Sequence, residues 1–299
     1  MQLLEDGSHQ SPAWFCLLTI WNSVILPPFL FCCQKGYLEC ISCFLENDTN
    51  IGVTDEEYGS ALAVASYWNQ IDIVRLLLNK GADVDLAAGR YGSALVAAAY
   101  SNNLEIVQIL LDSGADINSA DGEYGSALAA ASYQGHTNIA NFLLQNGADV
   151  SSSNGKYGSA LAAASYSDHL EFVHLLLNYG ADINSAGGEY GSALAAASYW
   201  GRIKIVHLFL DNGANVNAPG AKYGSALVAA IYGNEPEIVC LLLQNGADMN
   251  LAEREGGSAL AAASHCGCIN IVWLLLENGA DMNLVGKDYD TALAAVLGF

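Results

Sequence analysis

Serine, cysteine and histidine residues recur in this chain at spacings that could support catalysis or metal binding. A Gly-Ser-Ala-Leu motif returns every 33 residues and supplies Ser60, Ser93, Ser126, Ser159, Ser192, Ser225 and Ser258. A nucleophilic serine in a sharp strand-to-helix turn needs a second glycine after it, and this motif lacks that glycine. Seven serines at one repeating position therefore favour a structural role, in which each hydroxyl caps the N-terminus of a helix.

Four cysteines in the N-terminal part of the chain could together bind zinc through their thiolates. They form two close pairs and are Cys32, Cys33, Cys40 and Cys43. Cys32, Cys40 and Cys43 lie 33 residues, the interval of the serine motif, before Ala65, Ile73 and Leu76. These three residues are predicted core residues, and a buried cysteine thiol behaves as a small apolar side chain. We therefore favour a core role over a metal site.

The histidines and glycines also lack the patterns that bind metals or nucleotides. His169 and His174 are five residues apart, whereas two metal ligands on one helix face need a spacing of four. No Gly-x-x-x-x-Gly-Lys-Ser/Thr loop occurs in the sequence, and no Gly-x-Gly-x-x-Gly motif follows a predicted strand. Because no nucleophile, base and orienting residue occur together, we predict no catalytic residues, no metal, no cofactor and no enzymatic activity.

The serine motif belongs to a longer repeated pattern. The pentad Tyr-Gly-Ser-Ala-Leu begins at residues that we call the pentad tyrosines: Tyr58, Tyr91, Tyr124, Tyr157, Tyr190 and Tyr223. Variants of the pentad follow from Gly256 and from Tyr289 at the same interval. A Gly-Ala-Asp motif keeps this interval from Gly81 to Gly279, and its aspartates are expected to form turns. A fixed period of this length predicts a stack of repeats.

Each repeat predicts two short helices, as residues 123–155 illustrate. A first helix is expected to begin after the N-cap residue Ser126 and to end at Gly135. A second helix is expected over Thr137–Gln145, followed by Gly147 in a left-handed C-terminal cap. Helices this short are marginal alone, so neighbouring repeats must stack to complete a core.

The period, the Ser-Ala-Leu helix start, the paired leucines such as Leu143-Leu144 and the Gly-Ala-Asp turn resemble the ankyrin repeat. The resemblance implies an all-α fold, an α-solenoid of stacked 33-residue helix-turn-helix repeats with short hairpin loops. Ankyrin repeats usually have Thr-Pro-Leu-His where this chain has Ser-Ala-Leu-Ala or Ser-Ala-Leu-Val, so the inter-repeat histidine hydrogen bonds are expected to be missing. The Tyr-Gly-Ser-Ala-Leu variant resembles ankyrin arrays of filamentous fungi, including those of nucleotide-binding immune-receptor-like proteins.

The resemblance sets the expected domain boundaries. Seven full repeats are predicted over residues 57–287, and an incomplete repeat over residues 288–299. The residues before the first full repeat align with it at a shift of one period, so a degenerate capping repeat is expected over residues 25–56. Residues 1–24 form an apolar N-terminal segment to which no structure is assigned.

Residues 11–33 raise the alternative of a membrane anchor. This run contains no charged residue and is long enough to span a bilayer. Pro27 and Pro28 fall where the degenerate repeat should begin its first helix, and no basic segment precedes the run as in a secretory signal. We therefore favour an irregular N-terminal cap, or a truncated gene product, over a membrane span.

The amino-acid composition indicates which classes of partner and which cellular compartment suit this protein. The 299 residues include 31 Asp and Glu against 10 Lys and Arg, and the formal net charge is −21. This charge disfavours nucleic acids and anionic membranes, because their phosphates attract Lys and Arg. A content of 53% hydrophobic residues excludes a disordered chain. Eight cysteines, too few and too clustered for a disulfide scaffold, indicate an intracellular protein, cytoplasmic or nuclear.

Two columns of residues alternate from repeat to repeat. The residue before each pentad changes charge sign, and we call this set the charge column: Glu57, Arg90, Glu123, Lys156, Glu189, Lys222 and Glu255. Large Trp68, Gln134 and Trp200 alternate with small Ser101, Ser167 and Gly233. Both columns indicate a duplicated pair of repeats. Charges about 10 Å apart attract by only about 0.4 kcal/mol in water, so the charge column is expected to set register or recognition more than stability.

A second tyrosine column lies near the end of each first helix. We call its members the helix-end tyrosines: Tyr67, Tyr100, Tyr133, Tyr166, Tyr199 and Tyr232. In ankyrin proteins the first helices and hairpin tips line the concave face, so the resemblance places this column in that groove. Tyrosine and tryptophan offer large, rigid contact area with a polar handle. The candidate protein-binding residues are therefore Tyr67, Trp68, Tyr100, Ser101, Tyr133, Gln134, Tyr166, Tyr199, Trp200 and Tyr232. Alternatively the rings only fill gaps between repeats, which we favour for the pentad tyrosines.

Together these features predict a non-enzymatic protein-interaction module, a scaffold or adaptor that binds a protein segment on its concave face. The acidic charge predicts a basic or aromatic-seeking segment as the ligand. Three alternatives are a sensor array split from a fungal signalling receptor, an ankyrin transcriptional co-regulator, and an ankyrin protein anchored to a membrane through residues 11–33. An enzyme is the weakest alternative, because no set of catalytic groups stands out.

Overall fold

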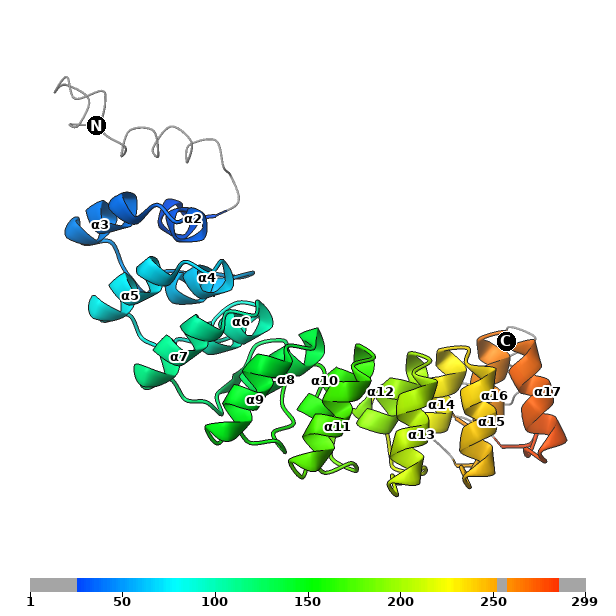
Figure 1. Ribbon diagram of the computed structural model, residues 1–299. Helices are drawn as coiled ribbons and strands as arrows, with labels where there is room; N and C mark the ends of the chain where they lie inside the picture. Colours follow the sequence, from blue (N-terminus) through cyan, green and yellow to red (C-terminus); the bar gives the residue numbers. More distant parts are fainter. Residues whose placement is uncertain (1–25, 252–256, 285–299) are drawn as a thin grey trace. The chain divides into compact units, whose positions relative to one another are not determined.

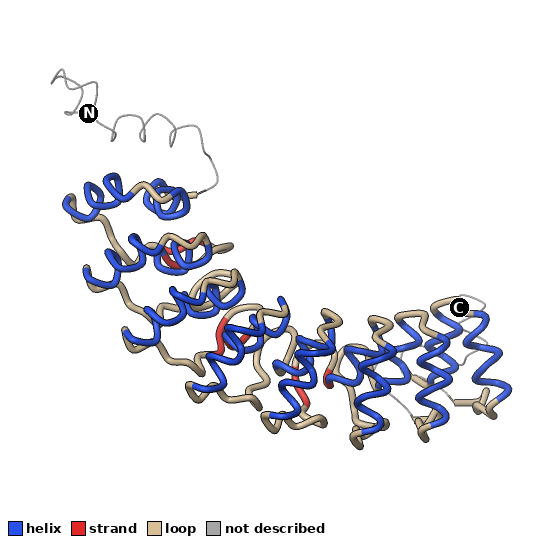
Figure 2. The backbone as a smooth tube through the Cα atoms, in the orientation of Figure 1, coloured by secondary structure: helices blue, strands red, loops and turns tan. Residues whose placement is uncertain are grey.

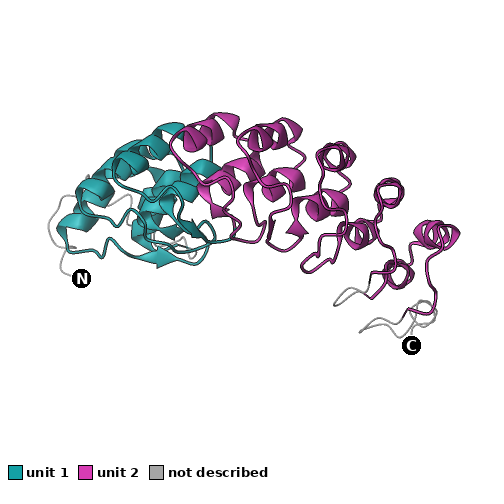
Figure 3. Cartoon of the chain, turned by 90° about the horizontal axis from the view of Figure 1, so that it is seen from below, with its two compact units in different colours: residues 1–123 teal, residues 124–299 magenta. Residues whose placement is uncertain are grey.

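The computed structural model describes residues 26–251 and 257–284, and the chain divides into two compact units. Unit 1 comprises residues 1–123 and unit 2 residues 124–299 (Figure 3). Within the described residues, sixteen α-helices and six two-residue β-strands alternate as helix pairs and hairpins. The predicted all-α solenoid of stacked helix-turn-helix repeats with short hairpin loops is confirmed.

Unit 1 contains three helix pairs. Its elements are α2 (Pro28–Lys35), α3 (Leu38–Glu46), β1 (Thr54–Asp55), β2 (Gly59–Ser60), α4 (Ala61–Tyr67), α5 (Ile71–Asn79), α6 (Ala94–Tyr100), α7 (Leu104–Asp112) and β3 (Ala120–Asp121). The first helices α2, α4 and α6 lie side by side, and α3, α5 and α7 form a second layer (Figure 1). β1 and β2 pair antiparallel, with Thr54 opposite Ser60.

Unit 2 repeats the same arrangement. Its elements are β4 (Gly125–Ser126), α8 (Ala127–Gln134), α9 (Thr137–Gln145), α10 (Ala160–Tyr166), α11 (Leu170–Asn178), β5 (Ala186–Gly187), β6 (Gly191–Ser192), α12 (Ala193–Tyr199), α13 (Ile203–Asp211), α14 (Ala226–Tyr232), α15 (Pro236–Gln244), α16 (Ala259–His265) and α17 (Ile269–Glu277). The first helices α8, α10, α12, α14 and α16 pack in one row, more closely than the second helices do. The short strands precede the first helices (Figure 2).

The first helices are short, alanine-rich and almost wholly buried. In α8 the Ser126 hydroxyl accepts a hydrogen bond from the Ala129 N–H at 3.2 Å. Equivalent bonds cap five other first helices, at Ser60, Ser93, Ser159, Ser192 and Ser258. The capping role predicted for these serines is confirmed. Ser225 is the N-cap residue of α14 but makes no side-chain cap hydrogen bond, so the prediction is wrong in this detail for Ser225. Because alanine projects only a methyl group, adjacent first helices can approach closely and exclude water from the joint between repeats.

The second helices bury one face and end at glycine. In α13 the buried residues are Ile205, Val206 and Phe209. After α9, the Ala148 N–H donates to the Leu143 carbonyl at 3.0 Å, and Gly147 has φ +91°. This is the Schellman arrangement, and it confirms the predicted left-handed cap at Gly147.

The Gly-Ala-Asp aspartates form the expected turns and also connect repeats. Each accepts a hydrogen bond at Oδ1 from the backbone N–H two residues later, at 2.8 to 3.1 Å, and they are Asp83, Asp116, Asp149, Asp182, Asp248 and Asp281. The residue two positions after this aspartate, or after Asn215 in the Gly-Ala-Asn variant of the motif, forms a hydrogen bond with the next repeat. Asn217 Oδ1 accepts from the Asp248 N–H at 2.8 Å, and Asn250 Oδ1 from the Asp281 N–H at 3.0 Å. The hairpin tips are therefore held at a fixed spacing.

Only the end of the apolar run 11–33 lies among the described residues. Helix α2 begins at Pro28, a residue that suits the first turn of a helix because its missing N–H is not needed there. Across residues 26–251 and 257–284, no helix is long and apolar enough to cross a membrane. The predicted segments 1–24 and 288–299 lie outside the described residues.

Candidate functional site

The candidate binding residues all lie where first helices end. Five of them are the last residues of α4, α6, α10, α12 and α14, namely Tyr67, Tyr100, Tyr166, Tyr199 and Tyr232. Tyr133 and Gln134 are the last two residues of α8, and Trp68, Ser101 and Trp200 are C-cap residues. The local fold explains this placement, since the pentad serine fixes where each helix begins and a left-handed residue after the helix ends it.

A pentad tyrosine and the helix-end tyrosine of the same repeat meet across the first helix. Tyr58 precedes α4, and Tyr67 ends it. The seven residues of α4 make about two turns, which returns the chain to the same side of the helix. The two ring centroids are 5.8 Å apart. Each of the six repeats that begin with a pentad tyrosine therefore carries a pair of contacting rings beside its first helix.

In unit 2 these pairs and Trp200 join into one continuous array, which we call the unit-2 ladder: Tyr124, Tyr133, Tyr157, Tyr166, Tyr190, Tyr199, Trp200, Tyr223 and Tyr232. The ring centroid of Tyr157 lies 4.6 Å from that of Tyr133 and 5.0 Å from that of Tyr166. It therefore bridges two repeats. Along one column, Tyr133 and Tyr166 stack at 5.4 Å. These separations lie in the range of favourable aromatic contacts.

Unit 1 has a shorter array of the same kind, the unit-1 ladder: Tyr58, Tyr67, Trp68, Tyr91 and Tyr100. The ring centroid of Tyr91 lies 4.9 Å from that of Tyr67 and 5.1 Å from that of Tyr100. Tyr67 also contacts Trp68 in an edge-on geometry at 5.4 Å. A pentad tyrosine again bridges the helix-end tyrosines of two repeats.

The pentad tyrosines and the helix-end tyrosines differ in solvent exposure. Tyr91, Tyr124, Tyr157 and Tyr190 are buried, so these pentad tyrosines fill joints between repeats as expected. Tyr58 and Tyr223 are half-buried, and so are the helix-end tyrosines. The two tryptophans are the most exposed members of the candidate set, at 42% for Trp68 and 39% for Trp200. The accessible surface of the ladders therefore comes mainly from the two tryptophans, the helix-end tyrosines, Tyr58 and Tyr223.

Trp200 is held in a fixed orientation by three tyrosines. Its indole Nε1–H donates to the Tyr190 hydroxyl at 2.8 Å. The indole packs edge-on against Tyr166 of the preceding repeat, with centroids 4.7 Å apart, and against Tyr199 at 5.3 Å. Ser167, the residue equivalent to Trp200 in that preceding repeat, is small. A small residue at the equivalent position of the preceding repeat thus accompanies a tryptophan that packs against a tyrosine of that repeat.

Five ladder tyrosines have a raised pKa, so their hydroxyls stay protonated at physiological pH. Burial, followed by a hydrogen bond with Tyr67, raises the pKa of Tyr91. Burial is likewise the largest cause of a raised pKa at Tyr58, Tyr166, Tyr190 and Tyr199. A neutral hydroxyl both donates and accepts hydrogen bonds, so the ladder offers polar contacts without adding negative charge.

The charge column forms direct ion pairs. Lys222 Nζ lies 2.6 Å from Glu189 Oε1, and Arg90 Nε bonds Glu123 Oε2. The backbone brings these residues together, because the Lys222 N–H donates to the Glu189 carbonyl at 3.1 Å. The expected separation of about one helix diameter, about 10 Å, is therefore wrong for these pairs. Lys222 Nζ also lies 5.0 Å from the Tyr223 ring centroid, which places a cation beside the ladder.

The repeat geometry agrees with the comparison to known families. A family model described as ankyrin repeats (3 copies) matches residues 29–121, 95–187, 127–220 and 193–286. These overlapping matches cover well over half of the chain. The chain belongs to the ankyrin-repeat family. A search of curated proteins finds no match to it. Ankyrin repeats are in general protein–protein interaction modules, and the narrower likeness to fungal receptor arrays stays a prediction.

The ankyrin repeats of this chain share a set of inter-repeat hydrogen bonds that the sequence pattern did not reveal. The residue before a second helix forms a hydrogen bond with a carbonyl at the end of the first helix of the preceding repeat. Asn103 Nδ2 donates to the Ser66 carbonyl at 2.7 Å, and His169 Nε2 lies 3.1 Å from the Tyr133 carbonyl oxygen. Gln70 and Arg202 make the same link. Four different residue types share this role, so no recurring residue type identifies the position in the sequence. The position could have been recognised only because it directly follows a residue in the left-handed conformation.

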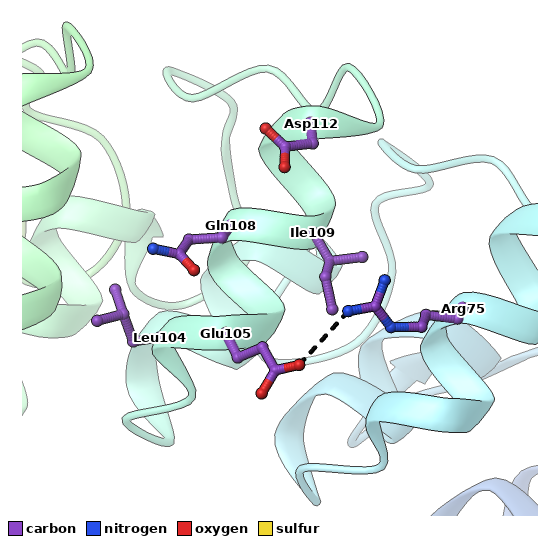
Figure 4. A pocket seen from close by; sticks show the side chains of 6 residues that line it. All are labelled: Arg75, Leu104, Glu105, Gln108, Ile109 and Asp112. Atoms are coloured by element: carbon purple, nitrogen blue, oxygen red, sulfur yellow. Dashed lines mark hydrogen bonds and ion pairs between the residues drawn. The ribbon is translucent and has the colours of Figure 1, made fainter.

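A shallow pocket of about 500 Å³ lies on the second helices of unit 1 (Figure 4). Arg75 of α5 lines it together with Leu104, Glu105, Gln108, Ile109 and Asp112 of α7. Arg75 Nη2 lies 3.4 Å from Glu105 Oε1, and both side chains are more than half exposed. The pocket is formed by the second helices, whereas the ladder is formed where the first helices end.

Cys32 and Cys40 occupy the core positions that the period predicts, and Cys33 is buried as well. Cys43 is exposed and its equivalent Leu76 is half-buried, so the predicted core role is wrong for Cys43. Burial is the largest cause of a raised pKa at Cys33, which keeps that thiol protonated. In the part of the chain that the structure describes, no group of three or more His, Cys, Asp or Glu side chains could hold a metal ion.

Proposed function

We propose that this ankyrin array is a non-enzymatic scaffold or adaptor that binds a protein segment on the face where its first helices end, the concave face of ankyrin arrays. Trp200 carries this proposal. Its indole is 39% exposed, yet it is fixed by Tyr166, Tyr190 and Tyr199. Exposed aromatic side chains that are held in place are typical anchors of protein interfaces.

Preorganisation favours binding at this surface. A flexible side chain loses rotamer entropy when a partner immobilises it, at a cost of about 0.5–1.5 kcal/mol. The ring contacts of Trp68 and Trp200 already restrict these side chains in the unbound protein. The neighbouring helix-end tyrosines add hydroxyls that can hydrogen-bond to a peptide backbone.

Charge favours a basic partner segment. The net charge of −21 attracts cationic segments over several ångströms and speeds their encounter with the array. Exposed indole faces at Trp68 and Trp200 can accept a Lys or Arg side chain through cation–π contacts. The same charge opposes nucleic acids. We place this binding inside the cell, in the cytoplasm or the nucleus, where thiols are kept reduced.

Selection of peptides from a random displayed library tests the proposal, because such a selection needs no identified partner. The full chain, its Trp68→Ala/Trp200→Ala variant and a Trp273→Ala control would be compared. Trp273 is 63% exposed on α17, a second helix, so the control removes an equally large exposed indole away from the ladders. We expect the native chain and the control to enrich Lys- and Arg-containing peptides and the double variant to lose them.

Circular dichroism of all three proteins must show equal helicity for this comparison to hold. Equal enrichment by the native chain and a folded double variant would contradict a binding role for the ladder tryptophans. Loss of helicity in the double variant would instead assign Trp68 and Trp200 to the core. In that case Trp68→Phe/Trp200→Phe, which keeps aromatic packing, would be compared in the same selection.

A further inference from the structure

Cys266, Gly267 and Cys268 form the turn between α16 and α17. Cys266 is the C-cap residue of α16, and Cys268 is the N-cap residue of α17. Both are free thiols; Cys266 is exposed and Cys268 is half-buried. The equivalent turns hold no cysteine in the other repeats, where they read, for example, Ser167-Asp168-His169 and Trp200-Gly201-Arg202. The thiol pair is thus a feature of this turn alone among the repeats.

The backbone of this turn brings the two cysteines within disulfide range. The Cys268 N–H donates to the Ala263 carbonyl at 3.0 Å, and the Gly267 N–H to the Ser264 carbonyl at 3.1 Å. This Schellman arrangement holds Gly267 in the left-handed helical region, with φ +68°. Around one residue with helical dihedrals of either hand, the flanking Cα atoms are about 5.4 Å apart. Disulfides span Cα separations of roughly 4.4–6.8 Å.

The thiol of Cys268 also lies against the backbone of its partner. Its Sγ is 3.9 Å from the Cys266 carbonyl oxygen and 3.9 Å from the Ile231 carbonyl oxygen. Burial, followed by the charge of Cys268, raises the pKa of the Cys266 thiol. Burial also raises the pKa of Cys268. The Cys266 thiol is therefore close enough to be affected by Cys268, and both thiols are largely protonated at neutral pH.

We propose that Cys266 and Cys268 form a thiol–disulfide exchange site that reacts with low-molecular-weight disulfides of the glutathione type. The exposed Cys266 thiolate attacks one sulfur of the small disulfide and expels the other as a thiolate. The Cys268 thiolate then attacks the Cys266 sulfur and expels the remaining half. One S–S bond breaks and one forms in each step. Overall, two electrons and both cysteine protons pass to the small disulfide, which leaves as two thiols.

Exposure makes this site reversible. A disulfide at an exposed turn has a higher reduction potential than a buried structural one, so cellular thiols reduce it readily. This chemistry does not depend on the proposed binding function, because thiol–disulfide exchange at Cys266 and Cys268 uses no side chain of the ladders.

Mass analysis of the full chain after incubation with glutathione disulfide tests the site. Remaining thiols would be blocked with N-ethylmaleimide before digestion. We expect the peptide that contains Cys266 and Cys268 to lose two hydrogens and to carry no maleimide. In Cys268→Ser we expect one glutathionyl group to remain on Cys266, because the resolving thiol is missing. Exposed Cys43, which has no second thiol across a single glycine, is the internal control and should carry only glutathionyl or maleimide.

The reaction should also accelerate by about tenfold per pH unit between pH 6 and pH 8, because only the thiolates attack and both pKa values are raised. Maleimide on both Cys266 and Cys268 after the incubation would overturn the proposal, whatever the state of Cys43. So would separate glutathionyl groups on the two residues of the native chain without an internal disulfide.

Discussion

At the scale of single residues, Trp200 shows how an exposed side chain can still support the fold. Its ring contacts with Tyr166 and Tyr199 and its hydrogen bond to Tyr190 would all be lost in Trp200→Ala. We expect this change to lower the free energy of unfolding by about 2 kcal/mol. Trp200→Phe keeps a ring and loses the hydrogen bond, so about half of that loss is expected.

Urea unfolding followed by circular dichroism measures these changes. Trp273→Ala is the matched control, because Trp273 is 63% exposed and lies on a second helix, away from the ladders; a change within about 0.5 kcal/mol is expected. If Trp200→Ala lowered the free energy of unfolding as little as Trp273→Ala does, the ladder contacts would contribute nothing to stability. A packing role for Trp200 would then be wrong.

The buried tyrosines predict a loss of stability at alkaline pH. Burial raises the pKa of Tyr91 and Tyr190 in the folded state, whereas unfolded tyrosine has a pKa of about 10. Their contribution is fully present below pH 10. Above it the unfolded chain releases protons that the folded chain retains, so stability falls as pH rises. Urea midpoints at pH 9 and pH 10.5 should show this fall, and Tyr91→Phe should reduce it. An equal fall in Tyr91→Phe would assign the effect to other groups.

At the scale of elements, two glycines with nearly equal φ angles distinguish the cost of a left-handed backbone from the cost of steric crowding. Gly180 has φ +84°, and a Cβ there would meet nothing within 4 Å. Gly191 has φ +82°, and its Cβ would lie 2.3 Å from the Ala221 backbone nitrogen. Gly180→Ala should therefore cost about 1 kcal/mol, from the left-handed backbone alone. Gly191→Ala should cost at least about 3 kcal/mol, because backbone must also move. Thermal unfolding of the two variants compares them directly, and equal midpoints would show that the hairpin yields easily.

Helix boundaries were predictable because single residues set them. Ser126 caps α8, and Gly135 and Gly147 take the left-handed conformations that end α8 and α9, so residue type alone located both helices. The interlocked ladder was not predictable in this way. Tyr157 contacts Tyr133 across a joint between repeats, and this distance depends on how repeats stack. The two tyrosine columns were therefore assigned separate roles, although the structure makes them one array.

The same reason applies to the charge column and to the joints between repeats. The alternation of sign was visible in the sequence, but the direct contact of Lys222 with Glu189 follows from a backbone hydrogen bond between neighbouring repeats. The link from His169 to the Tyr133 carbonyl had no sequence signal, because other residue types fill its position elsewhere. Pattern therefore identifies the repeat, whereas packing between repeats decides how its polar side chains are used.

At the scale of the whole molecule, the excess of acidic residues opposes folding and favours binding of a cation. With 31 Asp and Glu against 10 Lys and Arg, repulsion among like charges exceeds the attraction of the exposed ion pairs. Salt screens both effects. Raising NaCl from about 20 mM to about 500 mM should therefore raise the thermal midpoint by about 3 °C or more.

The same change in salt should weaken the capture of a Lys- and Arg-containing peptide, because steering by the net charge is screened. Circular dichroism measures the thermal midpoint, and fluorescence anisotropy measures the peptide affinity, in the same buffers. We expect salt to raise the midpoint and to lower the affinity. A midpoint that fell with salt would mean that ion pairs such as Lys222 with Glu189 outweigh the overall repulsion. A peptide affinity that did not change would mean that the aromatic ladders bind through contact area alone, and the expectation of a basic partner would be wrong.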